Sequence, residues 1–78
     1  MSKIPVINAK TMEKVLFCLG FKKIRQKGSH AFYKHPDGRT TTVPHHQGRD
    51  LAVPLIKEIL KDIKLSVDEF IEIINKVK

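Results

Sequence analysis

The sequence of 78 residues contains a single cysteine, Cys18, so no disulfide bond can form within the chain. No apolar run approaches the length needed to span a membrane. The first residues also lack the apolar core of a secretory signal peptide, and we therefore expect a cytoplasmic protein. Internal repeats and low-complexity tracts are absent as well. The length predicts one small domain with no room for a large cofactor site or a two-domain cleft.

Acidic residues are scarce in the middle of the chain. The formal net charge is +7, and residues 22–49 hold seven lysines and arginines against one acid, Asp37, which gives this block +6. A concentrated positive block is typical of a protein that binds a polyanion such as nucleic acid. The alternative is an ordinary solvated, lysine-rich surface. Because the block surrounds a Gly-Ser-His sequence, nucleic acid is the favoured interpretation.

Hydrophobic periodicity predicts an α+β fold in the order helix, three strands and helix, with an additional C-terminal helix. The predicted elements are a helix over about residues 9–19, strands over 21–27, 30–35 and 40–43, and helices over about 53–63 and from 66. Two helices packed on one face of a three-stranded antiparallel sheet would leave the other face open for a ligand.

Capping residues support the helix boundaries. Asn8 is expected to cap the first helix, and Ser66 with Glu69 is expected to form a capping box on the last one. Two apolar side chains are assigned to the core: Ile24 should point inward from the first strand, and Cys18 should lie beside the apolar stripe of the first helix.

The second strand carries Phe32 on one face and Tyr33 on the other. One of these aromatic rings could stack on a nucleic-acid base, but we expect Phe32 to pack against the helices. The segment from Pro36 to Arg39 has the composition of a turn, and we assign Asp37 no role beyond that turn.

His30 is the main candidate for chemistry. It follows Gly28 and Ser29, where the backbone could approach a ligand closely, and imidazole acts as an acid or a base near neutral pH. A neutral imidazole could take the 2′-hydroxyl proton of a bound RNA, and that oxygen could attack the adjacent phosphorus without a metal ion. Alternatively, His30 only hydrogen-bonds within a hairpin. The pattern alone slightly favours this second interpretation, because most surface histidines have no chemical role.

His45 and His46 follow a proline in an extended stretch. Neighbouring extended residues point to opposite faces, so at most one of the pair can share a site with His30. The spacing of the histidines and the cysteine matches no zinc motif, and we expect neither a metal site nor a cofactor. Ser29 adjoins His30, but neighbouring residues rarely form a catalytic pair, so serine-hydrolase chemistry is not expected.

Four segments together carry a resemblance to a known family: Leu19-Gly20-Phe21, Gln26-Lys27-Gly28-Ser29-His30, His35-Pro36-Asp37-Gly38-Arg39 and Thr42-Val43-Pro44-His45-His46. Over about residues 5–65 the chain resembles the HicA-type toxins. The resemblance implies a double-stranded-RNA-binding-domain-like fold, cleavage of messenger RNA, and neutralisation by a HicB-type antitoxin encoded beside the toxin. It also implies that the catalytic histidine is His30. We therefore predict one HicA-like domain over residues 1–78, with its core at about 5–65 and an extra helix at about 66–77.

The leading hypothesis is the toxin of a type II toxin–antitoxin pair, a metal-independent endoribonuclease with His30 as general base. The residues expected to contact RNA are basic or adjoin the Gly-Ser-His sequence: Lys22, Lys23, Arg25, Lys27, Ser29, Lys34, Arg39 and His46. Two alternatives stay open. The chain could be a non-catalytic RNA-binding module of the same fold, or a small interaction domain whose basic face binds an acidic protein.

Overall fold

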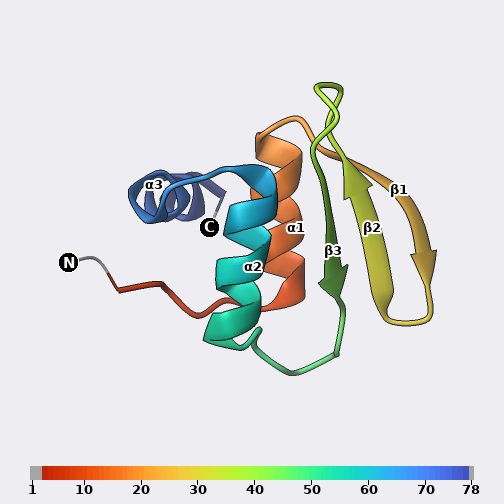
Figure 1. The fold of residues 1–78 in the computed structure, drawn as a ribbon. Helices are drawn as coiled ribbons and strands as arrows, with labels where there is room; N and C mark the ends of the chain where they lie inside the picture. Colours follow the sequence, from red (N-terminus) through yellow and green to blue (C-terminus); the bar gives the residue numbers. More distant parts are fainter. Residues whose placement is uncertain (1–2, 78) are drawn as a thin grey trace.

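The structure of the chain is a computed structural model that describes residues 3–77. Its elements are, in chain order, α1 (Ala9–Cys18), β1 (Lys22–Lys27), β2 (His30–Lys34), β3 (Thr40–Pro44), α2 (Val53–Ile63) and α3 (Val67–Val77) (Figure 1). The strands form one antiparallel sheet in the order β1-β2-β3. The predicted α+β fold, with a helix, three strands and two further helices, is confirmed.

Local hydrogen bonds explain where the helices begin and end. Asn8 caps α1, because its Oδ1 accepts a hydrogen bond from the Thr11 backbone nitrogen at 2.8 Å. The capping box of α3 also forms: the Glu69 nitrogen donates to Ser66 Oγ at 3.2 Å, and the Ser66 nitrogen donates to Glu69 Oε1 at 3.1 Å. Lys64 ends α2 in the left-handed conformation, with φ 55°, and its N–H donates to carbonyls of the last turn.

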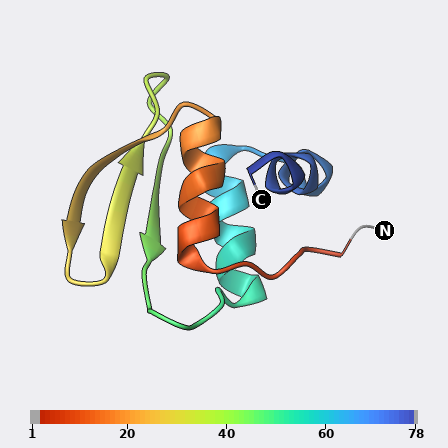
Figure 2. The same ribbon diagram turned by 180° about the vertical axis from the view of Figure 1, so that it is seen from behind.

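The three helices lie on one side of the sheet. In both ribbon views α1 and α2 stand side by side next to the sheet, and α3 lies beyond them on the side away from the strands (Figures 1 and 2). The contacts agree, since α2 packs against β3 and α3 packs against α1. The largest fully buried side chains come from every helix and from β2 and β3: Tyr33, Phe70, Met12, Leu16, Ile56, Ile59, Ile63, Val15 and Val43.

Two assignments to the core are wrong. Ile24 is 54% exposed, because β1 is an edge strand that stays exposed throughout and a β-bulge between Lys23 and Arg25 disturbs the alternation at Ile24. Cys18 is also exposed. At about 100° per residue, it lies roughly 110° around α1 from the middle of the apolar stripe, which places it outside the buried face.

Burial predicts how strongly single side chains stabilise this domain. Phe70 is fully buried on α3, so Phe70→Ala should lower the free energy of unfolding by about 3–5 kcal/mol. The control is Ile24→Ala on the exposed strand β1, which should change it by no more than about 0.5 kcal/mol. Urea denaturation followed by circular dichroism measures both. Similar losses for the two variants would contradict the placement of α3 in the core.

Candidate functional site

The face of the sheet turned away from the helices is built by the alternation of β2. Ala31 and Tyr33 point toward the helices, so their neighbours along the strand point outward. Directly opposite residues of antiparallel strands share a face. His30 pairs with Lys27 of β1, and Phe32 pairs with Arg25 of β1. This outward surface, which we call the outer face, therefore combines an imidazole, an aromatic ring and two cations.

A hollow of about 470 Å³ lies on the outer face, lined by Arg25, Lys27, His30, Phe32 and Thr42. The guanidinium carbon of Arg25 is 5.6 Å from the centre of the Phe32 ring, within the range of a cation–π contact. Three lining side chains carry or can carry positive charge. The hollow thus offers a flat apolar surface beside groups that attract phosphate.

The assignment of Phe32 to the helix-packed core is wrong. Phe32 is only partly buried, and it lines the hollow on the outer face. The physical reason is the alternation of β2: Ala31 and Tyr33 are fully buried on the helix side, which leaves the position between them on the opposite face. Phe32 is thus the aromatic side chain beside His30.

His30 lies at the start of β2 with an exposed side chain, which makes no hydrogen bond to any residue in the range 3–77. The corner before it is held by the backbone. Gly28 has φ +59° with nothing near its missing Cβ, so glycine serves the backbone conformation there and not a close packing contact. The Ser29 carbonyl accepts a hydrogen bond from the His45 nitrogen at 2.5 Å. The hairpin bond considered as the alternative role of His30 is not formed by its side chain.

Most of the predicted RNA contacts gather around His30. Lys22 of β1 and Lys34 of β2 lie opposite each other on the outer face, at the other end of the two strands from Lys27 and His30. Ser29 lies at the corner between β1 and β2, and His46 is exposed in the loop after β3. Pro44, two residues before His46, pairs with His30, so this loop leaves the sheet at the edge of the site.

Two predicted contacts lie elsewhere. Lys23 pairs in register with the buried Tyr33, and its Nζ is 3.2 Å from Glu13 Oε2 on α1, so it faces the helix side. Arg39 lies in the turn after β2, where its Nε donates to Asp37 Oδ2 at 2.7 Å and its guanidinium carbon lies 5.2 Å from the centre of the Phe21 ring. Both cations already have partners inside the domain.

A second cluster, absent from our sequence-based predictions, joins Glu13, Tyr33 and His45. The Tyr33 hydroxyl donates to Glu13 Oε2 at 2.5 Å, and His45 Nε2 lies 2.9 Å from the same hydroxyl. Because the hydroxyl proton goes to Glu13, the Tyr33 oxygen accepts from His45 Nε2–H. No sequence signal links three residues this far apart. The cluster turns His45 away from the outer face.

The protonation states in this cluster follow from its contacts. Burial and the hydrogen bond to Glu13 raise the pKa of Tyr33, so its hydroxyl stays protonated. Burial by itself would raise the pKa of Glu13, but hydrogen bonds from Tyr33 and Lys23 outweigh that effect and hold the pKa below its ordinary value of 4.5. An ionised Glu13 therefore joins α1 to β1, β2 and the end of β3 at neutral pH.

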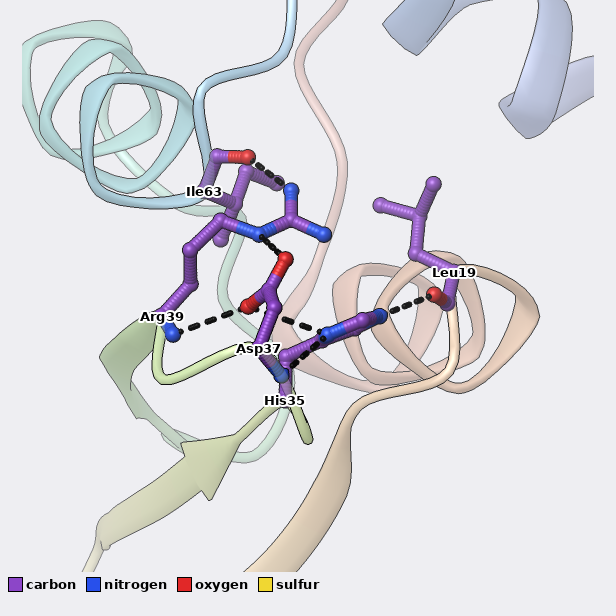
Figure 3. A network of polar contacts seen from close by, with 5 residues as sticks. All are labelled: Leu19, His35, Asp37, Arg39 and Ile63. Atoms are coloured by element: carbon purple, nitrogen blue, oxygen red, sulfur yellow. Dashed lines mark hydrogen bonds and ion pairs between the residues drawn. The ribbon is translucent and has the colours of Figure 1, made fainter.

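A third network explains the turn between β2 and β3 (Figure 3). The Asp37 carboxylate accepts from the Arg39 backbone nitrogen at 3.0 Å and lies 3.0 Å from His35 Nδ1. Arg39 Nη1 donates to the Ile63 carbonyl at the end of α2 at 2.5 Å, and His35 Nε2 lies 3.1 Å from the Leu19 carbonyl at the end of α1. Asp37 is thus more than a turn residue, since it orients two side chains that reach helix ends.

Residues 3–77 contain no group of three or more His, Cys, Asp and Glu side chains placed to hold a metal ion. In the same part of the chain, none of the helices has the length and apolar character needed to cross a membrane.

Fold and site together define a small α+β protein with one open, cationic, histidine-bearing sheet face. A family model described as HicA toxin of bacterial toxin–antitoxin matches residues 9–65. The chain therefore belongs to the HicA toxin family and is the toxin component of a toxin–antitoxin system, which implies an antitoxin partner. No curated protein matches the chain. The family match ends before α3, so this helix is an addition outside the matched region.

Glu13 should contribute stability in a defined pH range. Because its pKa is lowered in the folded state, its contribution is present above the unfolded value of 4.5 and is lost as the pH falls through the folded value. Glu13→Gln should reduce the free energy of unfolding at pH 7 by about 1 kcal/mol. The difference from the unsubstituted chain should shrink below about pH 4.

Urea denaturation at pH 7 and at pH 3.5 tests this expectation. Glu72→Gln is the matched control, because Glu72 is an exposed carboxylate on α3. The free energy of unfolding is compared between Glu13→Gln and the unsubstituted chain at each pH. The same difference at both pH values would show that the Glu13 charge does not stabilise the fold.

Proposed function

We propose that this toxin is an endoribonuclease that cleaves messenger RNA on the outer face, with His30 as the general base. The observation that supports this most directly is the unpaired His30 side chain in a hollow shared with Arg25, Lys27 and Phe32. A general base must have a free lone pair and must reach the proton it abstracts. The neighbouring cations match the charge of a phosphodiester, and Phe32 offers a surface on which a base can stack.

The reaction follows from these groups. The His30 imidazole accepts the proton of the 2′-hydroxyl, and the 2′-oxygen attacks the adjacent phosphorus. The bond from phosphorus to the 5′-oxygen breaks, and the leaving oxygen takes a proton from an acid or from water. The products are a 2′,3′-cyclic phosphate and a 5′-hydroxyl. Arg25 and Lys27 stabilise the negative charge that develops on the phosphorane.

The donor set near His30 favours a mechanism without a metal ion. Mg²⁺ is bound in nuclease sites through carboxylates, and the only acid in residues 22–49 is Asp37. The Asp37 carboxylate is engaged by Arg39 and lies beside His35 in the turn at the far end of β2. We accordingly assign the base role to the His30 imidazole and the charge stabilisation to Arg25 and Lys27.

The partner and the location follow from the same proposal. We propose a HicB-type antitoxin as the partner, since an acidic protein would complement the cationic outer face and associate with it rapidly. Because messenger RNA is the proposed substrate, the chain would act in the cytoplasm.

The central test replaces the base. His30→Ala should reduce cleavage of a messenger RNA by a factor on the order of 10² to 10⁴ while RNA binding and the unfolding transition stay unchanged. The loss is chemical, because the exposed His30 side chain forms no hydrogen bond or ion pair with any residue in the range 3–77. Free imidazole should restore part of the activity by entering the vacated hollow. Cleavage by the unsubstituted chain should persist in EDTA.

A substrate analogue separates this mechanism from its alternatives. RNA with 2′-O-methyl groups lacks the nucleophile, so it should bind and resist cleavage. Cleavage of this analogue, a 5′-phosphate product, or activity lost in EDTA and restored by Mg²⁺ would show that another mechanism operates. Binding of ordinary RNA without any cleavage would instead identify a non-catalytic RNA-binding module.

RNA binding should depend on the outer face and not on net charge. The double variant Arg25→Glu with Lys27→Glu should weaken binding of the 2′-O-methyl RNA by about 10- to 100-fold and reduce the salt dependence of the affinity. The matched control, Lys57→Glu with Lys61→Glu on α2, changes the net charge equally but should weaken binding less than about threefold.

Fluorescence anisotropy at several salt concentrations measures both variants. Equal losses of RNA affinity in the two double variants would mean that RNA binds through the overall charge of the chain. The outer face would then not be a specific binding site.

A further inference from the structure

A groove on the helical side of the molecule is separate from the outer face. Two adjoining hollows of about 690 and 540 Å³ share Ile4, Lys57, Ser66 and Val67 and so form one continuous depression. The walls come from the segment before α1, from α2 and from the start of α3. We call this depression the α2–α3 groove. In the ribbon views its elements lie on the side of the helices away from the strands that carry His30 (Figures 1 and 2).

The floor of the groove is apolar. Ile4, Leu65 and Val67 line it, and each is only partly buried although it packs against the hydrophobic core. Val53 and Leu60 of α2 contribute further apolar surface. A concave apolar surface of this kind gains free energy when apolar side chains fill it.

The rim of the groove is cationic. Lys57 and Lys61 lie one turn apart on α2, Lys64 follows at the end of that helix, and Lys3 lies on the opposite wall. Among residues 3–77 none of these four ammonium groups forms an ion pair with a carboxylate. Asp68 is the one acidic residue of the lining. The positive charge around the apolar floor therefore favours binding of a negatively charged partner.

We propose that the α2–α3 groove binds an acidic, amphipathic segment of the antitoxin. Apolar side chains of that segment would enter the groove, and its carboxylates would reach the lysines of the rim. The identity of the protein as the antitoxin rests on the toxin assignment and the proposed function, whereas the chemistry of the segment rests on the groove itself. This contact would be additional to the one that we propose between the antitoxin and the outer face.

Other occupants fit the groove less well. RNA would match the lysines, but the lining contains no aromatic side chain on which a base can stack, and its apolar floor would stay unfilled. A second copy of this chain would bring another net charge of +7 against the cationic rim. An acidic amphipathic protein segment supplies apolar side chains for the floor and carboxylates for the lysines of the rim.

A defined peptide tests the groove. The probe is a helical peptide of about 14 residues with leucines spaced i, i+3, i+4 and i+7 and glutamates on both sides of that stripe. The unsubstituted chain should bind it, and Lys57→Glu with Lys61→Glu should weaken binding on the order of tenfold or more. The matched control is Lys14→Glu with Lys76→Glu, which changes the net charge equally outside the groove and should weaken binding by less than about threefold.

A second peptide with serine in place of leucine tests the apolar floor at constant charge, and it should bind at least about tenfold more weakly. The same protein variants are then compared for cleavage of RNA, which Lys57→Glu with Lys61→Glu should leave intact. Peptide binding that depends on the groove supports the proposal even if the chain proves to cleave no RNA, so the two proposals fail separately.

Five results would overturn the proposal. The first is a failure of the leucine peptide to bind the unsubstituted chain. Equal binding of the leucine and serine peptides, or equal losses in the groove and control variants, would reduce the effect to general electrostatics. A loss of RNA affinity confined to Lys57→Glu with Lys61→Glu would identify an RNA surface. Self-association in sedimentation velocity that this variant abolishes would identify a second copy of the chain as the occupant.

Discussion

Tyr33 lies fully buried on the central strand β2, and its position determines which face of the sheet the helices cover. The ring packs edge-on against Phe17 of α1, with centroids 6.1 Å apart, and the hydroxyl joins Glu13 to His45. Because side chains alternate along a strand, burial of Tyr33 leaves His30 on the opposite face. A shift of one residue would bury an imidazole and expose the Tyr33 ring, so packing and the candidate site depend on the same register.

The basic residues of the central block have two different roles. Arg25 and Lys27 line the hollow beside His30, where their charge is available to a ligand. Lys23 and Arg39 belong to the same basic stretch, but they pair with Glu13 and Asp37 and help to hold helices against the sheet. The net charge of the block therefore overstates its free charge. What matters for a polyanion is the charge that remains unpaired on one face.

The domain offers two surfaces that point in different directions. The outer face of the sheet carries the proposed nuclease site, and the α2–α3 groove lies across the helices from it. The family match covers α1 to α2 and ends at residue 65, whereas α3 packs on α1 and completes one wall of the groove. The start of α3 thus forms part of the groove although this helix lies outside the matched region. With this arrangement, a partner bound in the groove would leave the geometry of the outer face unchanged.

The sequence alone was enough to predict the order of the helices and strands, the Asn8 and Ser66 caps and the position of His30 after a tight corner. These features depend on contacts between near neighbours. The family could also be predicted from short sequence motifs, whereas the face shared by Lys27 and His30 came from the strand register of the folded chain. Three features could be seen only in the folded chain: Ile24 is exposed, Phe32 lies beside His30, and Glu13 bonds Tyr33. Edge position and a β-bulge decide the exposure of Ile24, and pairing between residues 20 positions apart decides the bond between Glu13 and Tyr33. The place of Phe32 depends on which face of β2 packs against the helices, and alternation along the strand does not determine that choice.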